Sequence, residues 1–299
     1  MKNFDVIIIG GSYAGLSAGM SLGRSLRKTL IIDSGKPCNR QTPHSHNFIT
    51  HDGKAPKKIS DLAREQVAAY ETVKFHEGIV AALKKTDEGF EAETSTGEKF
   101  YSKKLILASG VKDVMPEIPG FAECWGISVL HCPYCHGYEV KNEVTGILSD
   151  GDMGYEFSKV VYNLTKDLFL FSNGQSELSK DQKNKLAQNN ISLVEDKIEK
   201  IEHENGYIRK IIFKSGKEIS LQALYAKIPF EQNINVSDDL GCELTEHGFI
   251  KIDDMHKTNI PGVFAAGDNV TMMRSVANAV AQGNFTGAIV NKELADEEF

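Results

Sequence analysis

The first 33 residues constrain the fold most strongly, because their pattern runs from strand through glycine turn and helix to a second strand. FDVIII is a near-continuous apolar run typical of a buried parallel strand, GGSYAG is a turn, LSAGMSLGRSL has helical spacing, and KTLIID is a second strand. This order predicts a dinucleotide-binding βαβ unit. We expect backbone N–H groups at the helix N-terminus to face a pyrophosphate, and Asp33 to accept a hydrogen bond from a ribose hydroxyl.

This turn departs from the G-x-G-x-x-G pattern at one position. Gly10 and Gly15 are present, but Ser12 stands where the second glycine belongs. The serine hydroxyl can donate to a phosphate, although its side chain narrows the approach of a ligand. The turn therefore indicates a nucleotide site, and the alternative is a βα turn that binds no nucleotide.

Two later segments repeat the form of a strand that ends in small residues. LILASGVKDVMPEIPG, at 105–120, predicts a strand, a small-residue turn and a proline-marked domain boundary. PGVFAAGDN, at 261–269, predicts a strand that ends in Gly267 and Asp268, and the residues after it have helical spacing. An acid that follows a parallel strand lies where ligands bind in open α/β sheets.

Length and composition predict two globular domains. The chain has 299 residues, of which 41% are hydrophobic and 25% are charged. Its formal net charge of -7 argues against a nucleic-acid or anionic-membrane partner. The apolar runs are too short to span a bilayer, and the N-terminal run has no small-residue cleavage site, so we expect a cytoplasmic protein.

The stretch HCPYCHGYE, residues 131–139, allows three interpretations. A zinc site needs about four ligands, which a single chain turn cannot wrap around a tetrahedral ion, so we expect no metal. A permanent disulfide across two residues would stabilise little and would tend to be reduced in the cytosol. The pattern favours a redox-active pair, in which one of Cys132 and Cys135 is the nucleophile and the other resolves the mixed disulfide.

Together, GGSYAG, Asp33, LILASG and GVFAAGD resemble the FAD-binding signatures of the thioredoxin reductase family, and CPYC lies where that family keeps its redox-active CxxC. The resemblance covers essentially the whole chain. It implies an α/β fold with two Rossmann-like dinucleotide-binding domains and a homodimer. A discontinuous FAD-binding domain would comprise residues 1–115 and 236–299, and an NAD(P)H-binding-like domain carrying the CxxC would comprise 116–235.

The resemblance also implies roles for individual residues. Cys132 would exchange with substrate, Cys135 would face the flavin, and Asn47 with Phe48 resembles a flavin-contacting pair, for which a solvated loop is the alternative. The expected FAD contacts, some of them placed by the strand patterns above, are Gly10, Ser12, Ala14, Gly15, Asp33, Asn47, Ala108, Ser109, Gly110, Gly267 and Asp268.

Position 136 departs from the pattern of the thioredoxin-reducing members, which usually have an acid there. This sequence has His136, as do relatives that oxidise small-molecule dithiols. A histidine beside a redox cysteine is a candidate catalytic proton shuttle between thiol and flavin. The alternative is a histidine that caps a helix or lies at the surface.

A second departure concerns the pyridine nucleotide. Between residues 144 and 171 a βαβ pattern recurs, but Ser149 replaces the first glycine of its turn. Family members that use NADPH place arginines after the second strand to bind the 2′-phosphate. Here Ser172, Asn173 and Gly174 follow that strand, and no arginine occurs before Arg209. NADPH, NADH, another electron donor and oxygen therefore all remain open as redox partners.

The sequence thus predicts an FAD-dependent dithiol/disulfide oxidoreductase. Electrons pass between the flavin and the Cys132–Cys135 pair, which exchanges with a small-molecule dithiol or disulfide, or with a thioredoxin-like protein. One alternative is an NAD(P)H-dependent thioredoxin-disulfide reductase. The other is a flavoprotein redox sensor without catalytic turnover.

Overall fold

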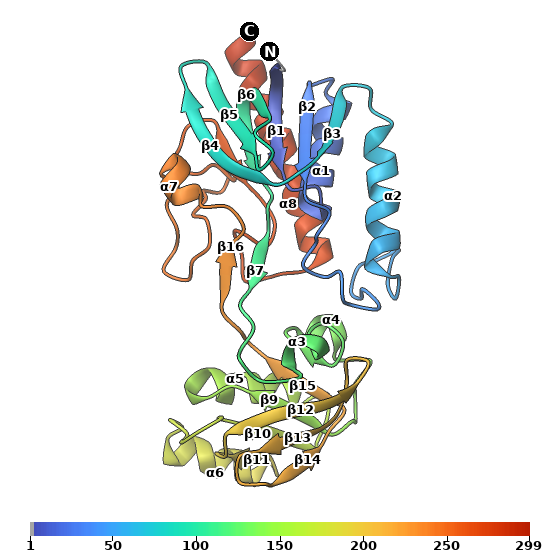
Figure 1. The fold of residues 1–299 in the computed structure, drawn as a ribbon, viewed down its shortest axis with the longest axis vertical. Coiled ribbons are helices and arrows are strands. Elements are labelled where there is room, and N and C mark those ends of the chain that lie inside the picture. The colour runs from blue at the N-terminus through green and yellow to red at the C-terminus, as the bar shows by residue number, and fades with distance from the viewer. Residues whose placement is uncertain (1–2) are drawn as a thin grey trace. The chain divides into compact units, whose positions relative to one another are not determined.

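The computed structural model describes residues 3–299, which divide into two compact units (Figure 1). The first unit contains Met1–Arg40, Phe48–Asp113 and Phe230–Phe299, and the second contains Gln41–Asn47 and Val114–Pro229. Each unit has its own parallel sheet, so the predicted α/β class with two Rossmann-like sheets is confirmed. The assignment of residues 1–115 and 236–299 to an FAD-binding domain, and of 116–235 to an NAD(P)H-binding-like domain, stays a prediction.

The first unit is built on a seven-stranded sheet with a parallel centre. Its parallel strands are β1 (Asn3–Ile9), β2 (Thr29–Asp33), β3 (Val73–Glu77), β6 (Lys99–Leu107) and β17 (Val263–Ala265). The strand β6 pairs with β1 along one edge, and its other edge pairs first with an antiparallel strand and then with β17. All five parallel strands therefore end at the same edge of the sheet.

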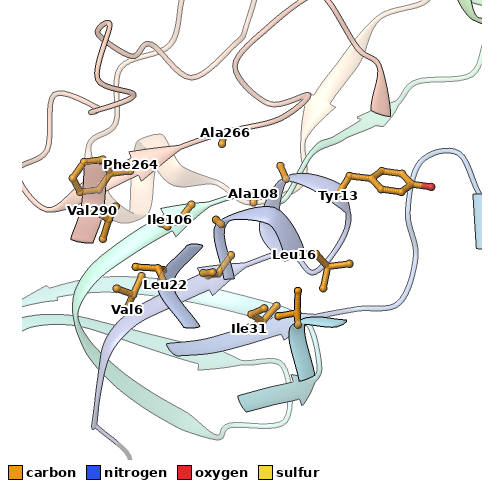
Figure 2. Packing of buried hydrophobic residues seen from close by; sticks show 14 of the residues in the cluster. Val6, Tyr13, Leu16, Leu22, Ile31, Ile106, Ala108, Phe264, Ala266 and Val290 are labelled. Carbon is orange, nitrogen blue, oxygen red and sulfur yellow. The ribbon is translucent and has the colours of Figure 1, made fainter. Parts of the chain in front are cut away.

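The remaining elements of this unit are the antiparallel strands that complete the sheet, a separate two-stranded antiparallel ladder, and the helices. Their bounds are β4 (Val80–Thr86), β5 (Gly89–Thr94), β7 (Val111–Asp113), β16 (Phe230–Gln232), α1 (Tyr13–Arg24), α2 (Pro56–Ala68), α7 (Val236–Leu240) and α8 (Val276–Glu298). One face of the sheet is buried under α1, where Leu16 and Leu22 belong to the same buried cluster as Ile106 and Phe264 (Figure 2). The helices α1 and α8 approach closely, because a Cβ on Gly283 would lie only 2.0 Å from the carbonyl oxygen of Ala14.

The second unit has a five-stranded sheet in the order β11-β10-β9-β15-β8, and every pairing in it is parallel. A three-stranded antiparallel sheet covers part of its core. The elements are α3 (Phe121–Cys124), β8 (Val129–Leu130), α4 (Pro133–His136), β9 (Thr145–Leu148), α5 (Gly151–Val161), β10 (Leu168–Phe171), α6 (Lys180–Gln188), β11 (Ser192–Val194), β12 (Ile198–Glu204), β13 (Tyr207–Phe213), β14 (Glu218–Ser220) and β15 (Ala223–Ala226). Within residues 3–299, no helix combines the length and the apolar character that crossing a membrane requires.

Candidate active site

The two cysteines of the CxxC form a disulfide at the start of α4, directly after β8. Cys132 is the N-cap residue of this short helix, Pro133 is its first helical residue, and the two cysteine Cα atoms are 5.3 Å apart. The backbone N–H of Cys135 donates to Cys132 Sγ at 3.1 Å. Proline suits the first helical position because its fixed φ matches the helix and it lacks a donor that would be unsatisfied there. Both cysteines are partly exposed, so the disulfide is open to exchange.

The other cysteines do not join this pair. Cys124 and Cys242 are buried free thiols, and Cys38 lies in the other unit from the disulfide. Over the described part of the chain, no group of three or more His, Cys, Asp or Glu side chains is arranged to hold a metal ion.

His136, the last residue of α4, is flanked by two titratable groups. The ring of His46 lies edge-on to that of His136, with the ring centroids 6.4 Å apart. The distance from His46 Nδ1 to Glu139 Oε1 is 3.4 Å. Burial, and then repulsion from His46 whenever that ring is protonated, lower the pKa of His136, whereas Glu139 acts in the opposite sense. The imidazole is therefore a neutral proton acceptor at neutral pH.

The first βα turn, between β1 and α1, requires its two glycines for steric reasons. Gly10 has a φ of +103°, and a Cβ there would lie 2.2 Å from the carbonyl oxygen of Ala108. A Cβ on Gly15 would lie 1.8 Å from the carbonyl oxygen of Gly10. These contacts are shorter than any real carbon–oxygen contact, so only glycine permits this close packing of turn and helix. Ser12 is the N-cap residue of α1, and its hydroxyl makes no capping hydrogen bond.

Asp33 ends β2 beside this turn and binds its backbone. Its carboxylate accepts from the N–H of Gly11 at 2.9 Å and from the N–H of Gly35 at 3.2 Å. The strand β1 lies between β2 and β6, so the acid and the turn share one edge of the sheet.

Other predicted site residues gather at the same edge because they follow parallel strands. Ala108, Ser109 and Gly110 come directly after β6, and Gly267 and Asp268 come after β17. Ala14 lies at the start of α1, where a Cβ on Gly267 would be 3.0 Å from its methyl group. Asn47 is the exception, because it lies in Gln41–Asn47, which belongs to the second unit.

Arg274, which the sequence analysis missed, forms an ion cluster with two acids of the first unit. It binds Asp113 through two nitrogens, at 2.8 and 3.2 Å, and its Nε lies 3.5 Å from Asp268 Oδ2. Burial raises the pKa of Asp268, and the guanidinium of Arg274 opposes this change. A single arginine in TMMRSV carries no recognisable motif, so no sequence signal pointed to it.

Cys38 lies against the same acid. Its sulfur is 3.5 Å from Asp268 Oδ2, and desolvation of the sulfur together with this carboxylate raises the pKa of the thiol to about 12. At neutral pH this cysteine is a thiol and a poor nucleophile.

Several buried polar atoms of the first unit lack a hydrogen-bond partner within the described residues. They include Asn39 Oδ1 and Asn269 Oδ1. Unsatisfied buried polar atoms are rare in proteins, and a bound polar ligand is one explanation for them. Asn269 follows the same strand as Asp268, so its unpartnered oxygen fits an edge that could bind the polar chain of a dinucleotide cofactor.

The second βα turn, between β9 and α5, carries acids instead. Asp150 is the N-cap residue of α5, and its carboxylate accepts from the hydroxyl of Ser176 at 2.8 Å and from the N–H of Glu177 at 2.9 Å. Asp152, in the first helical turn, accepts from Gln182 Nε2 at 2.7 Å. Glu177 also comes close to the turn, since its Oε2 would lie 3.8 Å from a Cβ on Gly151. The positions that would face a pyrophosphate therefore carry negative charge.

Comparison with known proteins identifies the family. The chain matches the pyridine nucleotide-disulphide oxidoreductase family over residues 4–283. It is 34% identical to "Thioredoxin reductase tcpT" of Claviceps purpurea, over 97% of this chain and 94% of that protein. The fold superposes on the crystal structure of TrxB from Bacillus anthracis with a TM-score of 0.94 and 32% identity, covering 99% of this chain and 100% of that one.

A crystal structure of an oxidoreductase from Agrobacterium tumefaciens is similarly close. It matches with a TM-score of 0.92 and 36% identity, over 98% of this chain and 99% of that one. These similarities extend over the whole length of each protein, and the disulfide of the CxxC agrees with them. The chain therefore belongs to the thioredoxin reductase-like branch of the pyridine nucleotide-disulphide oxidoreductase family and is a flavin-dependent disulfide oxidoreductase.

Proposed function

We propose that this protein uses FAD and the Cys132–Cys135 pair to oxidise a small-molecule dithiol. The observation that carries this proposal is the partly exposed disulfide beside a histidine that is neutral at neutral pH. A thiol must lose its proton to attack a disulfide, and a neutral imidazole can accept that proton. An acid at position 136 would be ionised over the same pH range and would repel an incoming thiolate.

The carboxyl edge of the first sheet would hold the FAD. The N–H groups at the start of α1 and the hydroxyl of Ser12 would bind its phosphates, and Asp33 and Asp268 would accept from its hydroxyl groups. Arg274 would fix the orientation of the Asp268 carboxylate. When bound, the flavin supplies a two-electron carrier between the cysteine pair and the final electron acceptor.

The second βα turn supports a weakened pyridine-nucleotide site. Two like charges 4 Å apart repel by about 1 kcal/mol in water and by about 4 kcal/mol at the effective dielectric of a protein surface. Asp150 and Asp152 would thus oppose a bound pyrophosphate, and no arginine lies near Asn173 in the sequence to offset them. Oxygen or another acceptor would then reoxidise the flavin.

The test is an anaerobic stopped-flow experiment that follows the flavin absorption. We expect dithiothreitol to bleach the flavin and NADPH and NADH to bleach it slowly, and we expect air to restore the colour. Cys135→Ser should abolish bleaching by the dithiol, whereas Cys124→Ala, which removes a buried free thiol of the same unit, should leave it intact. Rapid bleaching by NADPH at micromolar concentration would overturn the proposal.

A second candidate is an NAD(P)H-dependent thioredoxin reductase. The names of similar fungal proteins favour it, and so does Lys197, whose Cε would lie 3.7 Å from a Cβ on Gly174 in the turn after β10. A lysine there could contact a 2′-phosphate as a point charge. Lys197→Ala should then weaken NADPH binding and leave NADH binding unchanged, and reduction of a thioredoxin by NADPH would establish this activity. A homodimer stays a prediction for either function, and light scattering of the flavin-loaded protein would test it.

A further inference from the structure

The histidine that faces His136 lies on a segment built into the unit that carries the CxxC. Gln41–Asn47 follows β2 in the chain, yet it groups with Val114–Pro229. Gln41 Nε2 donates to the carbonyl oxygen of Ala122 at 3.5 Å, and Thr42 Oγ1 lies 3.0 Å from where a Cβ on Gly126 would be. These contacts fix the start of the segment on the second unit, so His46 is held at a defined place beside α4.

His46 connects His136 to an exposed carboxylate. The distance of 3.4 Å from His46 Nδ1 to Glu139 Oε1 is within ion-pair range, and the two side chains are 18% and 39% exposed. The rings of His46 and His136 meet at 88° with centroids 6.4 Å apart, a separation that one bridging water can span. The three groups thus form a row that leads from the neighbour of Cys135 to the surface.

We propose that His46 and Glu139 are positioning residues that receive the proton which His136 removes from a substrate thiol. This inference rests on the proposed dithiol oxidation. It adds a route by which His136 becomes neutral again between the two thiols of one substrate molecule.

The stoichiometry of the reaction explains why such a route is useful. The first substrate sulfur bonds to Cys132 Sγ as the Cys132–Cys135 bond breaks, and the electron pair of that bond stays on Cys135 Sγ. The second substrate sulfur then bonds to the first and releases Cys132 as a thiolate. The substrate loses two electrons and two protons, and the cysteine pair gains the electrons. His136 can hold one proton at a time, so transfer of the first proton to His46 lets it accept the second.

The titratable groups around this row are few. His136 faces His46 and Glu139, and His46 also has the ring of His44 at 6.4 Å. The disulfide does not titrate. Burial, and then the charge of Glu139, raise the pKa of Tyr225, so its hydroxyl stays neutral. The titratable side chains that meet His136 in this row are therefore those of His46 and Glu139.

The alternative is that His46 and Glu139 form an ordinary surface ion pair, which contributes about 0–1 kcal/mol to stability and nothing to catalysis. Another histidine–glutamate pair occurs in the first unit. His247 Nε2 lies 3.5 Å from Glu246 Oε1, and this pair is highly exposed. His247→Gln is therefore a matched control, because it removes a histidine–glutamate pair that has no cysteine neighbour in sequence.

The test measures how fast a dithiol reduces the Cys132–Cys135 pair in the flavin-loaded protein. Oxidised protein is mixed anaerobically with dithiothreitol between about pH 6 and about pH 9, quenched with acid and alkylated, and new thiols are counted by mass. We expect His46→Gln to lower the rate constant about 10-fold near neutral pH and Glu139→Gln to lower it a few-fold. Both variants should show a steeper rise of rate with pH, and added imidazole should restore His46→Gln.

The outcomes distinguish two failures: that of the proton relay, by which we mean transfer from His136 to His46 and Glu139, and that of the proposed dithiol oxidation. If wild type and His247→Gln gain two thiols rapidly while His46→Gln behaves like wild type at every pH, the relay is wrong and dithiol oxidation stands. A slower His46→Gln with an unchanged pH profile and no response to imidazole would make the residue merely structural, which also overturns the relay. If the wild-type pair is not reduced at all, the proposed function fails and the relay fails with it.

Discussion

The two βα turns of this protein follow the same chain path and differ in what they present at the helix N-terminus. In the turn before α1, glycines lie in close contact with backbone atoms. The acid of this turn, Asp33, lies at the end of the neighbouring strand and accepts a hydrogen bond from the backbone N–H of Gly11. The turn before α5 places Asp150 and Asp152 within the turn and the first helical residues. A helix N-terminus favours one negative charge, so in the first unit that place is available to a phosphate, whereas in the second unit the protein's own carboxylates compete for it.

The difference teaches that a βαβ topology does not by itself make a nucleotide site. Both turns join parallel strands and end at the carboxyl edge of a sheet. The first turn is defined by sterics, because its glycines permit close packing against the backbone. The second turn is defined by electrostatics, because it carries acidic side chains.

The largest expected effect comes from adding a methyl group to each turn. Gly15→Ala would place a Cβ 1.8 Å from a backbone oxygen, whereas in Gly154→Ala the nearest atom, the carbonyl carbon of Ser149, is 3.1 Å away. We expect Gly15→Ala to lose most of its flavin absorption and about 3 kcal/mol or more of unfolding free energy, and Gly154→Ala to lose about 1 kcal/mol. Flavin-to-protein absorbance and urea denaturation measure the two effects. Equal losses in the two variants would mean that the first turn is not the more tightly packed.

A smaller effect should follow from neutralising the acids of the second turn. Asp150→Asn with Asp152→Asn should tighten the binding of NADPH about 30-fold, because each of the two removed repulsions is worth about 1 kcal/mol in a water-like dielectric. Calorimetry at two salt concentrations measures this, and the gain should shrink as salt increases. Asp181→Asn, an acid in the first turn of α6, is the control and should leave the affinity unchanged. An unaltered NADPH affinity in the double variant would show that the charges of Asp150 and Asp152 do not weaken NADPH binding at this turn.

The smallest effect concerns the pH dependence of stability. Burial tends to raise the pKa of Asp150, but hydrogen bonds from Glu177 and Ser176 outweigh it and hold the pKa below its usual value. A lowered pKa means that the carboxylate stabilises the fold above its unfolded pKa of about 4, and that this contribution is lost as the pH falls through the folded value.

Asp150→Asn should therefore be less stable than wild type by about 0.5 kcal/mol at neutral pH, because solvent screens this partly exposed carboxylate, and the gap should close in acid. Urea denaturation at several pH values measures it. A constant gap down to the lowest pH at which the protein stays folded would contradict this prediction.

The sequence predicted the fold class and the type of redox chemistry, because both depend on local patterns. Alternation of apolar strand, glycine turn and helix marks a βαβ unit wherever it occurs, and two cysteines with two residues between them can form a bond after one turn of chain. The structure has the β1–α1–β2 unit and the disulfide where these patterns lie.

The surroundings of these elements could not be predicted, because long-range packing decides them. Arg274 and Asp113 form an ion pair although 161 positions of sequence separate them. The contact of His46 with Glu139 exists because the segment Gln41–Asn47, which follows β2, belongs to the second unit. No periodicity links such residues, since each pair is brought together by separate strands and loops.

By itself the sequence therefore determined a dinucleotide-type βαβ fold with a redox-active cysteine pair, since spacing along the chain fixes backbone geometry, and the resemblance to a known family pointed to the flavin. Only the tertiary structure decided which distant ionisable groups meet: the arginine beside Asp268 and the histidine beside His136. Electrostatic interactions act through space over a few ångströms, and the order of residues along a chain does not specify those distances.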